Sequence, residues 1–314
     1  MSKKKANVNQ PERFVNPYTD FGFKRLFGTE PNKEFLISFL NALFQGRRSP
    51  IVDIKYLNTA VLGPYYGDRN SVFDVYCETQ DKGQLIVEMQ RSDQPYFKDR
   101  TVYYGSAAVV HQAPKGEWDY CLKEVCIVGI LNFVFPNHEY GGDSYFHEVK
   151  LKDVSDNHVV YDKLTFYYLE MPKFDKGEEE LETMLDKWLY VVKNICHLLE
   201  QPKELQERVF TEFFEEARIA RFTPEEQFAY EESRKHYWDN LNTLNYSYDK
   251  GKMEGKEEGL AVGRKLGVAE GRELGVAENR RETARKMLSM GMEKDTILQV
   301  TGLTEEELLA LGDR

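Results

Sequence analysis

The sequence predicts an α/β domain followed by an all-helical region, and three patterns support this fold class. Apolar and polar residues alternate with the period of strands between residues 51 and 90. Strand-like and helix-like stretches then alternate up to residue 172, whereas strand signals stop after residue 178. Glycine recurs at every fourth position from 251 to 275. The 314 residues suffice for one large domain or two ordinary ones, with a buried core.

The N-terminal part of the chain is expected to hold two helices and a strand hairpin. A polar tail over residues 1–13 precedes helical patterns that begin near Asp20 and after Pro31. Residues 51–57, 71–78 and 84–90 then alternate as three strands. A turn at residues 81–83, closed by Gly83 in the left-handed conformation, joins the last two strands. This turn would place Asp74 opposite Gln90.

The middle of the chain continues the α/β pattern and then becomes helical. A helix is expected over residues 95–113, followed by a strand over 125–135 that is apolar throughout and therefore buried on both faces. Further strands are expected over 144–152 and 164–171, and amphipathic helices from residue 181 to residue 248. We therefore expect an α/β domain over residues 14–172 and a helical domain over residues 173–250.

The glycine repeat sets residues 251–281 apart. Glycine costs about 0.8–1 kcal/mol per position in a helix interior relative to alanine. The segment is therefore either a helix whose glycines let a partner backbone approach closely, or a partly helical, flexible tether. Three short helices over residues 282–314 have the layout of a helix-turn-helix, but the last begins at Thr304 with three glutamates, which would repel phosphate. We expect a small interaction or dimerisation module there.

The composition excludes several classes of protein. The 53 acidic and 42 basic residues give a formal charge of −11, which argues against tight, non-specific nucleic-acid binding. This acidity is concentrated in residues 176–232. The longest apolar run, residues 126–135, is far shorter than the roughly 20 residues that span a bilayer. The four cysteines show no zinc-site spacing and residues 1–10 no apolar signal, so we expect a cytoplasmic protein with reduced thiols and no membrane partner.

Two acidic residues in the hairpin are the candidates for chemistry. Because strand side chains alternate, Asp74, Glu88 and Gln90 share one face. Two carboxylates on an otherwise apolar strand pair repel each other, and a divalent cation such as Mg²⁺ removes that repulsion. An edge hairpin with both acids in solvent is the alternative that the spacing leaves open.

The hairpin resembles the D…E-x-K core of the PD-(D/E)XK nucleases, with Asp74, Glu88 and Gln90 followed by Arg91. More closely, the chain is similar to the recombination-promoting nuclease/transposase family of that superfamily, in which glutamine often stands at the lysine position. The similarity covers nearly the whole chain. It includes residues 16–27, 100–104 and 125–133, the helix around residues 186–188, the glycine repeat and the Gly-Leu-Thr tail at 302–304.

This resemblance implies a restriction-endonuclease-like core with a mixed central sheet. It also implies a Mg²⁺-dependent DNA endonuclease that promotes recombination or transposition. Asp74 and Glu88 would ligate Mg²⁺, or Mn²⁺, together with the backbone carbonyl of Met89, and the ion would activate a water. Gln90 stands at the lysine position, where an amide can orient the attacking water but carries no positive charge.

Residues near the hairpin complete the site that the resemblance implies. Glu34 would supply an extra carboxylate, while we favour a helix N-cap role for the competing candidate Asp20. The missing positive charge would come from Lys24, Arg91 or Arg100. Contacts with DNA are assigned to four basic residues, Lys24, Arg91, Lys98 and Arg100.

Two alternative functions and one further partner remain open. A decayed site would leave a nuclease-fold interaction protein that works through its helical half, and an RNA nuclease would use the same site as a DNA nuclease. The glycine repeat and the helical C-terminal region are the predicted surface for a homo-oligomer.

Overall fold

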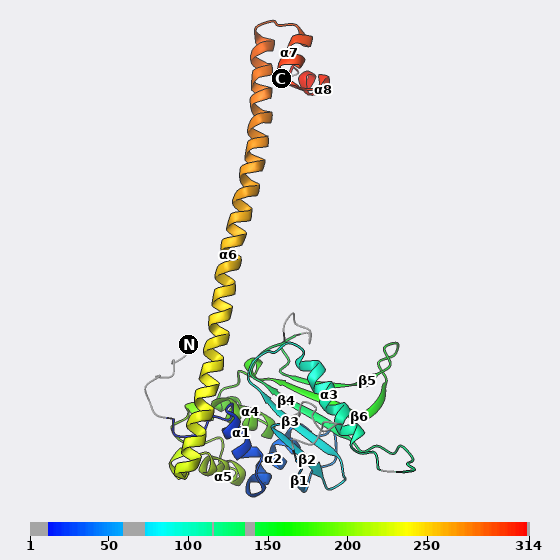
Figure 1. The fold of residues 1–314 in the computed structure, drawn as a ribbon, viewed down its shortest axis with the longest axis vertical. Coiled ribbons are helices and arrows are strands. Elements are labelled where there is room, and N and C mark those ends of the chain that lie inside the picture. Colours follow the sequence, from blue (N-terminus) through cyan, green and yellow to red (C-terminus); the bar gives the residue numbers. More distant parts are fainter. Residues whose placement is uncertain (1–11, 59–72, 115, 136–141, 313–314) are drawn as a thin grey trace. The chain divides into compact units, whose positions relative to one another are not determined.

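The protein has a mixed sheet covered by helices and followed by a helical region, which confirms the predicted fold class (Figure 1). The structure is a computed structural model that describes residues 12–58, 73–114, 116–135 and 142–312. The chain divides into two compact units, residues 1–241 and 242–314. The tail predicted over residues 1–13 lies outside the described residues, except for Glu12 and Arg13.

The sheet of the first unit has the strand order β1-β2-β3-β4-β6-β5. Its strands are β1 (Ile54–Tyr56), β2 (Val75–Thr79), β3 (Gln84–Gln90), β4 (Val125–Leu131), β5 (Phe146–Lys152) and β6 (Val159–Glu170). Strands β3, β4 and β6 are parallel, whereas β1–β2, β2–β3 and β5–β6 are antiparallel pairs. Gln90, Leu131 and Glu170 are level with one another, so the three parallel strands end at one edge of the sheet. Strand β4 is buried along its whole length, as its apolar run predicts.

The hairpin of β2 and β3 has a register that differs from the predicted one. Tyr76 pairs with Ile86 and the next pair is Val75 with Val87, which places Asp74 level with Glu88 rather than with Gln90. The difference in pairing is two residues, and strand side chains alternate with a period of two. The predicted sharing of one face by Asp74, Glu88 and Gln90 therefore holds in spite of the wrong register.

The turn of this hairpin explains the difference in register. The left-handed residue is Lys82, with a φ of 67°, and not Gly83 as predicted. The backbone N–H of Thr79 donates to the carbonyl of Gly83 at 2.8 Å, so these two residues close the loop. A Cβ on Gly83 would lie 3.1 Å from the Thr79 hydroxyl. Glycine therefore serves close packing at this position instead of a left-handed turn.

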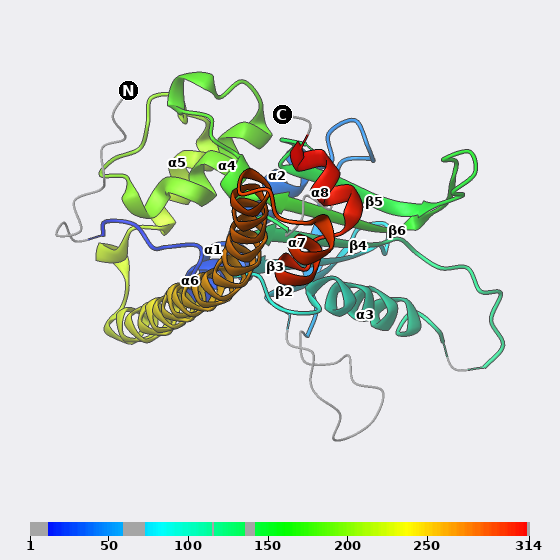
Figure 2. The same ribbon diagram turned by 90° about the horizontal axis from the view of Figure 1, so that it is seen from above.

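Helices cover both faces of the sheet (Figure 2). They are α1 (Asp20–Phe27), α2 (Lys33–Leu43), α3 (Phe97–Val110), α4 (Met184–Asn194) and α5 (Arg208–Glu216). Helix α3 packs on one face, over a core that includes Ile127 and Tyr168. Helices α1, α2, α4 and α5 pack on the other face, over a core that includes Val87 and Trp188. Two cores form because alternate strand residues point to opposite faces.

Helices α4 and α5 belong to the same unit as the sheet, although the sequence predicted a separate helical domain over residues 173–250. The rings of Trp188 and Phe213 lie 5.9 and 5.5 Å from the ring of Phe27 in α1. The buried indole of Trp188 donates a hydrogen bond to the Ser38 hydroxyl of α2 at 3.1 Å. An amphipathic sequence shows that a helix buries one face, but not which element covers it, and here the cover is α1 and α2.

Helix α6 (Pro224–Ser289) contains the whole glycine repeat. Nothing described lies within 4 Å of the Cβ position at any of the seven glycines from Gly251 to Gly275. The helix also includes the start of the predicted C-terminal module, so only α7 (Lys294–Thr301) and α8 (Glu305–Gly312) are separate helices there. The end of α6 packs with them around Ala284, Ile297 and Leu308. In the described part of the chain, no helix combines the length and the apolar character that a bilayer crossing needs.

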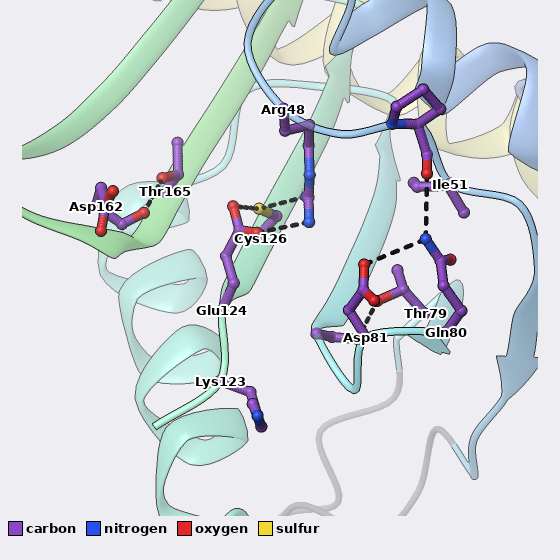
Figure 3. Close-up of polar contacts among 12 residues, drawn as sticks. Arg48, Ile51, Thr79, Gln80, Asp81, Lys123, Glu124, Cys126, Asp162 and Thr165 are labelled. Atoms are coloured by element: carbon purple, nitrogen blue, oxygen red, sulfur yellow. Dashed lines mark hydrogen bonds and ion pairs between the residues drawn. The ribbon is translucent and has the colours of Figure 1, made fainter. Parts of the chain in front are cut away.

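A group of side chains makes polar contacts at the end of the sheet where β3 and β4 begin (Figure 3). Arg48 follows α2 and reaches Glu124, with 2.6 Å between Nη2 and Oε2, and Cys126, with 3.1 Å between Nη1 and Sγ. The Cys126 thiol donates to the other Glu124 oxygen at 3.2 Å. Burial raises the pKa of Cys126, so the thiol stays protonated. The charge of Arg48 is therefore neutralised within the fold.

Candidate active site

The two predicted acidic residues lie together on the face of the sheet that α3 covers. Asp74 immediately precedes β2, and Glu88 lies in β3 with only 6% of its surface exposed. One carboxylate oxygen of Asp74 accepts the backbone N–H of Met89 at 2.7 Å. Among the described residues, the buried Oε1 of Glu88 has no hydrogen-bond partner. A buried carboxylate oxygen without a partner costs free energy, so it marks a place where a ligand fits.

Burial holds the pKa values of both carboxyl groups above their usual range. Burial raises the pKa of Glu88 to about 8, and the nearby charge of Asp74 contributes to this rise. Burial also raises the pKa of Asp74, while the hydrogen bond from Met89 opposes it. Two close, buried carboxyl groups cannot both ionise without a compensating positive charge. The pair is therefore chemically suited to a divalent cation.

Gln90 is held by hydrogen bonds at both ends of its amide. Its Oε1 accepts a hydrogen bond from the Arg100 guanidinium, and its Nε2 donates to the carbonyl of Ser92 at 2.9 Å. Arg100 lies in the first turn of α3, and its charge lowers the pKa of Glu88. Of the three predicted sources of positive charge, Arg100 is the one that contacts Gln90.

The backbone of Met89 points toward Asp74. The carbonyl of Gln90 accepts from Asn132, which follows β4, so the backbone groups of Gln90 face β4. Those of Met89 face the opposite way, toward β2, because the direction alternates along a strand. The Met89 carbonyl therefore lies on the side of the Asp74 carboxylate, as a shared metal ligand would require.

The two other predicted carboxylates lie differently from expectation. Glu34 is exposed and lies 4.0 Å from Arg208, and no described contact joins it to the hairpin. Asp20 is not the N-cap of α1, because that role belongs to Thr19, whose hydroxyl accepts the Gly22 N–H at 3.0 Å. The charge of Asp20 instead raises the pKa of Asp74, so Asp20 is the acid of α1 that acts on the site.

The predicted DNA-binding residues have different surroundings. Lys24 pairs with Asp20 at 2.9 Å, and both Lys24 and Arg91 lower the pKa of Asp74. The ammonium group of Lys98 lies 4.6 Å from the ring centroid of Phe135. These three cations and Arg100 thus border the acidic pair or the same face of the sheet.

Tyr104, which the sequence indicated as a core residue rather than a site residue, lies beside the acidic pair. Its buried ring packs edge-on against Phe73, with 4.6 Å between centroids, and the Arg100 guanidinium lies 6.0 Å from it. Burial raises the pKa of Tyr104, and the charge of Glu88 adds to this effect. Arg100 and Tyr104 are four residues apart on α3, and this spacing places both on one helix face. This spacing of four residues is the feature of the sequence that indicates that Tyr104 lies on the same helix face as Arg100.

Within the described residues, Asp74 and Glu88 are the carboxylates that come together at this site. No group of three or more His, Cys, Asp or Glu side chains in that part of the chain is arranged to hold a metal ion. Two carboxylates and a backbone carbonyl are nevertheless a sufficient oxygen set for Mg²⁺, which keeps several waters and is usually bound by one or two carboxylates.

The mixed sheet, its hairpin with an acidic residue on each strand and the flanking helices define a nuclease-like α/β protein of the PD-(D/E)XK class. Comparison with known families agrees. The family model described as PD-(D/E)XK nuclease family transposase matches residues 17–247, and the chain therefore belongs to that family. A second model, the C-terminal HTH domain of the Rpn/YhgA-like nuclease family, matches residues 277–313. No curated protein and no solved structure matches the chain significantly.

The second match changes the interpretation of the C-terminal module. We expected an interaction module because the last helix begins with glutamates, and Thr304 with Glu307 indeed forms the capping box of α8. The family model assigns a helix-turn-helix domain to this region, and such domains typically bind DNA. Glu307 of the first turn therefore serves helix capping, and these glutamates do not exclude a nucleic-acid partner.

Proposed function

We propose that the protein is a Mg²⁺-dependent endonuclease that hydrolyses phosphodiester bonds of DNA and promotes recombination or transposition. The observation that carries this proposal is the pair formed by the half-buried Asp74 and the buried Glu88, in which Glu88 Oε1 has no hydrogen-bond partner among the described residues. A fold that buries two repelling carboxyl groups gains stability when a divalent cation binds between them. Membership of a nuclease family gives that cation a role in hydrolysis.

The oxygen atoms of the site fit the proposed ion. Asp74 and Glu88 would bind Mg²⁺, or Mn²⁺, together with the Met89 carbonyl. When bound, the ion would lower the pKa of a water and would neutralise charge on the phosphate. The water oxygen bonds to phosphorus as the bond from phosphorus to one sugar oxygen breaks, which leaves a phosphate and a hydroxyl. Gln90 holds the Arg100 guanidinium beside this reaction.

Plasmid cleavage tests the proposed activity. Wild-type protein should nick supercoiled DNA in Mg²⁺ or Mn²⁺, while Asp74→Asn and Glu88→Gln, which retain side-chain shape, should be inactive. Glu34→Gln is the matched control, because this exposed acid lies beside Arg208 and should be dispensable. If purified wild-type protein never cleaves DNA but cleaves RNA with the same dependence on Asp74 and Glu88, the substrate is RNA. If it cleaves neither, the non-catalytic interaction protein is the correct interpretation.

We also infer that a second copy of the chain is a partner through the glycine repeat. Residues directly before the glycines form one row on α6, and residues directly after them form another. The row before the glycines begins with Lys250 and is then acidic and aliphatic: Glu254, Glu258, Val262, Leu266, Glu270 and Leu274. The row after them is basic and aliphatic: Lys252, Lys256, Leu260, Arg264, Val268, Arg272 and Val276.

These two rows favour a parallel, in-register pair of helices. In a parallel pair, the row before the glycines on one helix faces the row after the glycines on the other. Glu254 would then lie beside Lys252 and Lys256, and Leu266 beside Val268. In an antiparallel pair, each row would face its own copy, so glutamates would repel glutamates. Small residues at a spacing of four let two helix backbones approach closely with a right-handed crossing.

Charge reversal tests this self-association. Sedimentation should show that Glu254→Lys/Glu258→Lys/Glu270→Lys weakens the dimer, as should Lys252→Glu/Lys256→Glu/Arg272→Glu. Mixing the two variants should restore it in one heterodimer. The control is Glu257→Lys/Glu273→Lys, which changes charges two positions after a glycine, on the far side of the helix. A monomeric wild-type protein, or equal effects of control and test variants, would contradict the inference.

A further inference from the structure

Arg100 carries a positive charge that the described part of the chain does not neutralise. Three other arginines of the first unit each pair with a glutamate, namely Arg25 with Glu226, Arg47 with Glu148 and Arg48 with Glu124. No carboxylate of the described residues lies within the 4.0 Å that defines an ion pair with Arg100. The other partners of its guanidinium are neutral. A half-buried arginine without a counter-ion indicates a binding site for an anion.

Neutral groups nevertheless hold this guanidinium in one orientation. Nη2 donates to the Gln90 amide oxygen, and Nη1 donates to the amide oxygen of Gln94 at 3.0 Å. The guanidinium lies 5.2 Å from the ring centroid of Phe97 and 6.0 Å from that of Tyr104. Amides and aromatic rings fix an arginine without cancelling its charge. Such a guanidinium is preorganised for a charged ligand.

Two buried atoms at the acidic pair and Arg100 have no hydrogen-bond partner within the described residues. In the part of the chain that the structure describes, no group donates to Glu88 Oε1 and none accepts from Arg100 Nε. The two groups do not pair with each other, although they are close enough for the charge of Arg100 to lower the pKa of Glu88. Glu88 Oε1 can therefore bind a cation, and Arg100 Nε can bind an anion. A phosphate diester bound through a divalent cation supplies both.

We propose that Arg100 is a catalytic residue that binds a phosphate oxygen of the substrate and supplies the positive charge that Gln90 lacks. Gln90 is then a positioning residue, because it acts through the arginine that it holds. This inference rests on the proposed nuclease function. It deepens that proposal by explaining how a glutamine at the lysine position is compatible with hydrolysis.

The main test compares Arg100→Met with a rescue variant. Arg100→Met retains length and apolar contacts but removes the charge, and it should lower the rate of plasmid nicking by about 10²–10³-fold, as loss of one electrostatic contact to the transition state does. Adding Gln90→Lys to Arg100→Met places a cation on β3 and should recover at least part of that loss. Arg48→Met is the matched control, because its arginine is paired, and nicking per folded molecule should not change.

DNA affinity provides a readout that does not depend on catalysis. In the Glu88→Gln background, adding Arg100→Met should weaken the binding of a DNA duplex, measured by fluorescence anisotropy. It should also reduce the dependence of log affinity on log salt by about one phosphate contact. Adding Arg48→Met should leave both unchanged.

The outcomes separate this inference from the proposed function. If wild-type protein cleaves DNA and Arg100→Met cleaves equally well, Arg100 is structural and the inference is wrong, whereas the nuclease proposal stands. If wild-type protein does not cleave, the nuclease proposal fails, and the anisotropy arm still decides whether Arg100 binds phosphate. Should Arg100→Met not fold, Arg100→Lys retains the charge and loses the planar fork, and it should nick DNA more slowly than wild type with unchanged thermal stability.

Discussion

The two ends of the central sheet differ in whether their buried polar and charged groups have hydrogen-bond partners. At the end where β3 and β4 begin, Arg48, Glu124 and Cys126 satisfy one another (Figure 3). At the end where β3 finishes, Glu88 and Arg100 each have a buried atom that no described residue contacts by a hydrogen bond. Both ends lie on the same strands and belong to the same unit.

This difference indicates which polar residues stabilise the fold and which are arranged to bind a ligand. Mutual satisfaction of buried polar groups is what a stable interior requires. Groups left unsatisfied in a folded protein cost free energy, and they persist where a ligand repays that cost. Composition does not separate the two ends, since each holds a glutamate and an arginine. Their hydrogen bonding does.

The largest expected effect comes from removing one glutamate at each end. Glu88→Ala should lower plasmid nicking by at least about 10³-fold, because it deletes a proposed metal ligand. Glu124→Ala should leave nicking per folded molecule unchanged, because the Glu124 carboxylate binds Arg48 and Cys126 at the opposite end. Equal losses of activity in the two variants would remove the distinction between the ends.

A smaller effect is expected on stability, and in the opposite order. Glu124→Ala leaves the Arg48 guanidinium without its carboxylate, and we expect a loss of about 1–2 kcal/mol in the free energy of unfolding, since the pair is only partly buried. Glu88→Gln should not destabilise the metal-free protein at pH 8 or above, because it removes a charge whose burial costs more than the nearby charge of Arg100 offsets. Urea unfolding of the metal-free variants measures both, and a strongly destabilised Glu88→Gln would contradict this account.

The pH dependence of stability sharpens the comparison further. The pKa of Glu88 is about 8 in the folded protein and 4.5 in its ordinary environment, so the folded state binds this proton more tightly. The stabilising contribution of the protonated group is fully present below pH 4.5 and is lost as the pH rises toward 8. Metal-free wild-type protein should therefore lose stability over this range more steeply than Glu88→Gln. Parallel profiles for the two proteins would show that Glu88 has an ordinary pKa.

The smallest effect concerns the acids around the site. Asp20 raises the pKa of Asp74, so Asp20→Asn should weaken Mg²⁺ binding by a few-fold at most, through the loss of one nearby negative charge. Glu34→Gln should have no effect, because Glu34 lies beside Arg208. Titration of Mg²⁺ in the nicking assay compares the two variants. If Glu34→Gln weakened Mg²⁺ binding more than Asp20→Asn, Glu34 would be a residue of the metal site.

The sequence predicted what depends on local periodicity. Alternation along the hairpin gave the shared face of Asp74, Glu88 and Gln90, and the same face results from the true register because the register differs by two residues. The predicted left-handed residue of the turn was wrong. Glycine is the residue that most often takes this conformation, but here Lys82 takes it.

Long-range packing could not be predicted in this way. Nothing local to Trp188 indicates that its partners are Phe27 and Ser38, and this packing is what joins α4 to the sheet unit. The pairing of Arg100 with Gln90 likewise depends on how α3 lies over β3. The exposed Glu34 and the cap at Thr19 were misjudged for the same reason, because helix position alone does not show what a side chain meets.

The central claim is that the unsatisfied end of the sheet binds a divalent cation through Glu88. Thermal unfolding with and without Mg²⁺, at constant ionic strength and pH 7, tests it most directly. A ligand that binds only the folded state raises the unfolding temperature as its concentration rises. We predict that Mg²⁺ raises the unfolding temperature of the wild-type protein and not that of Glu88→Gln. An equal rise in both proteins, or no rise in either, would contradict the account.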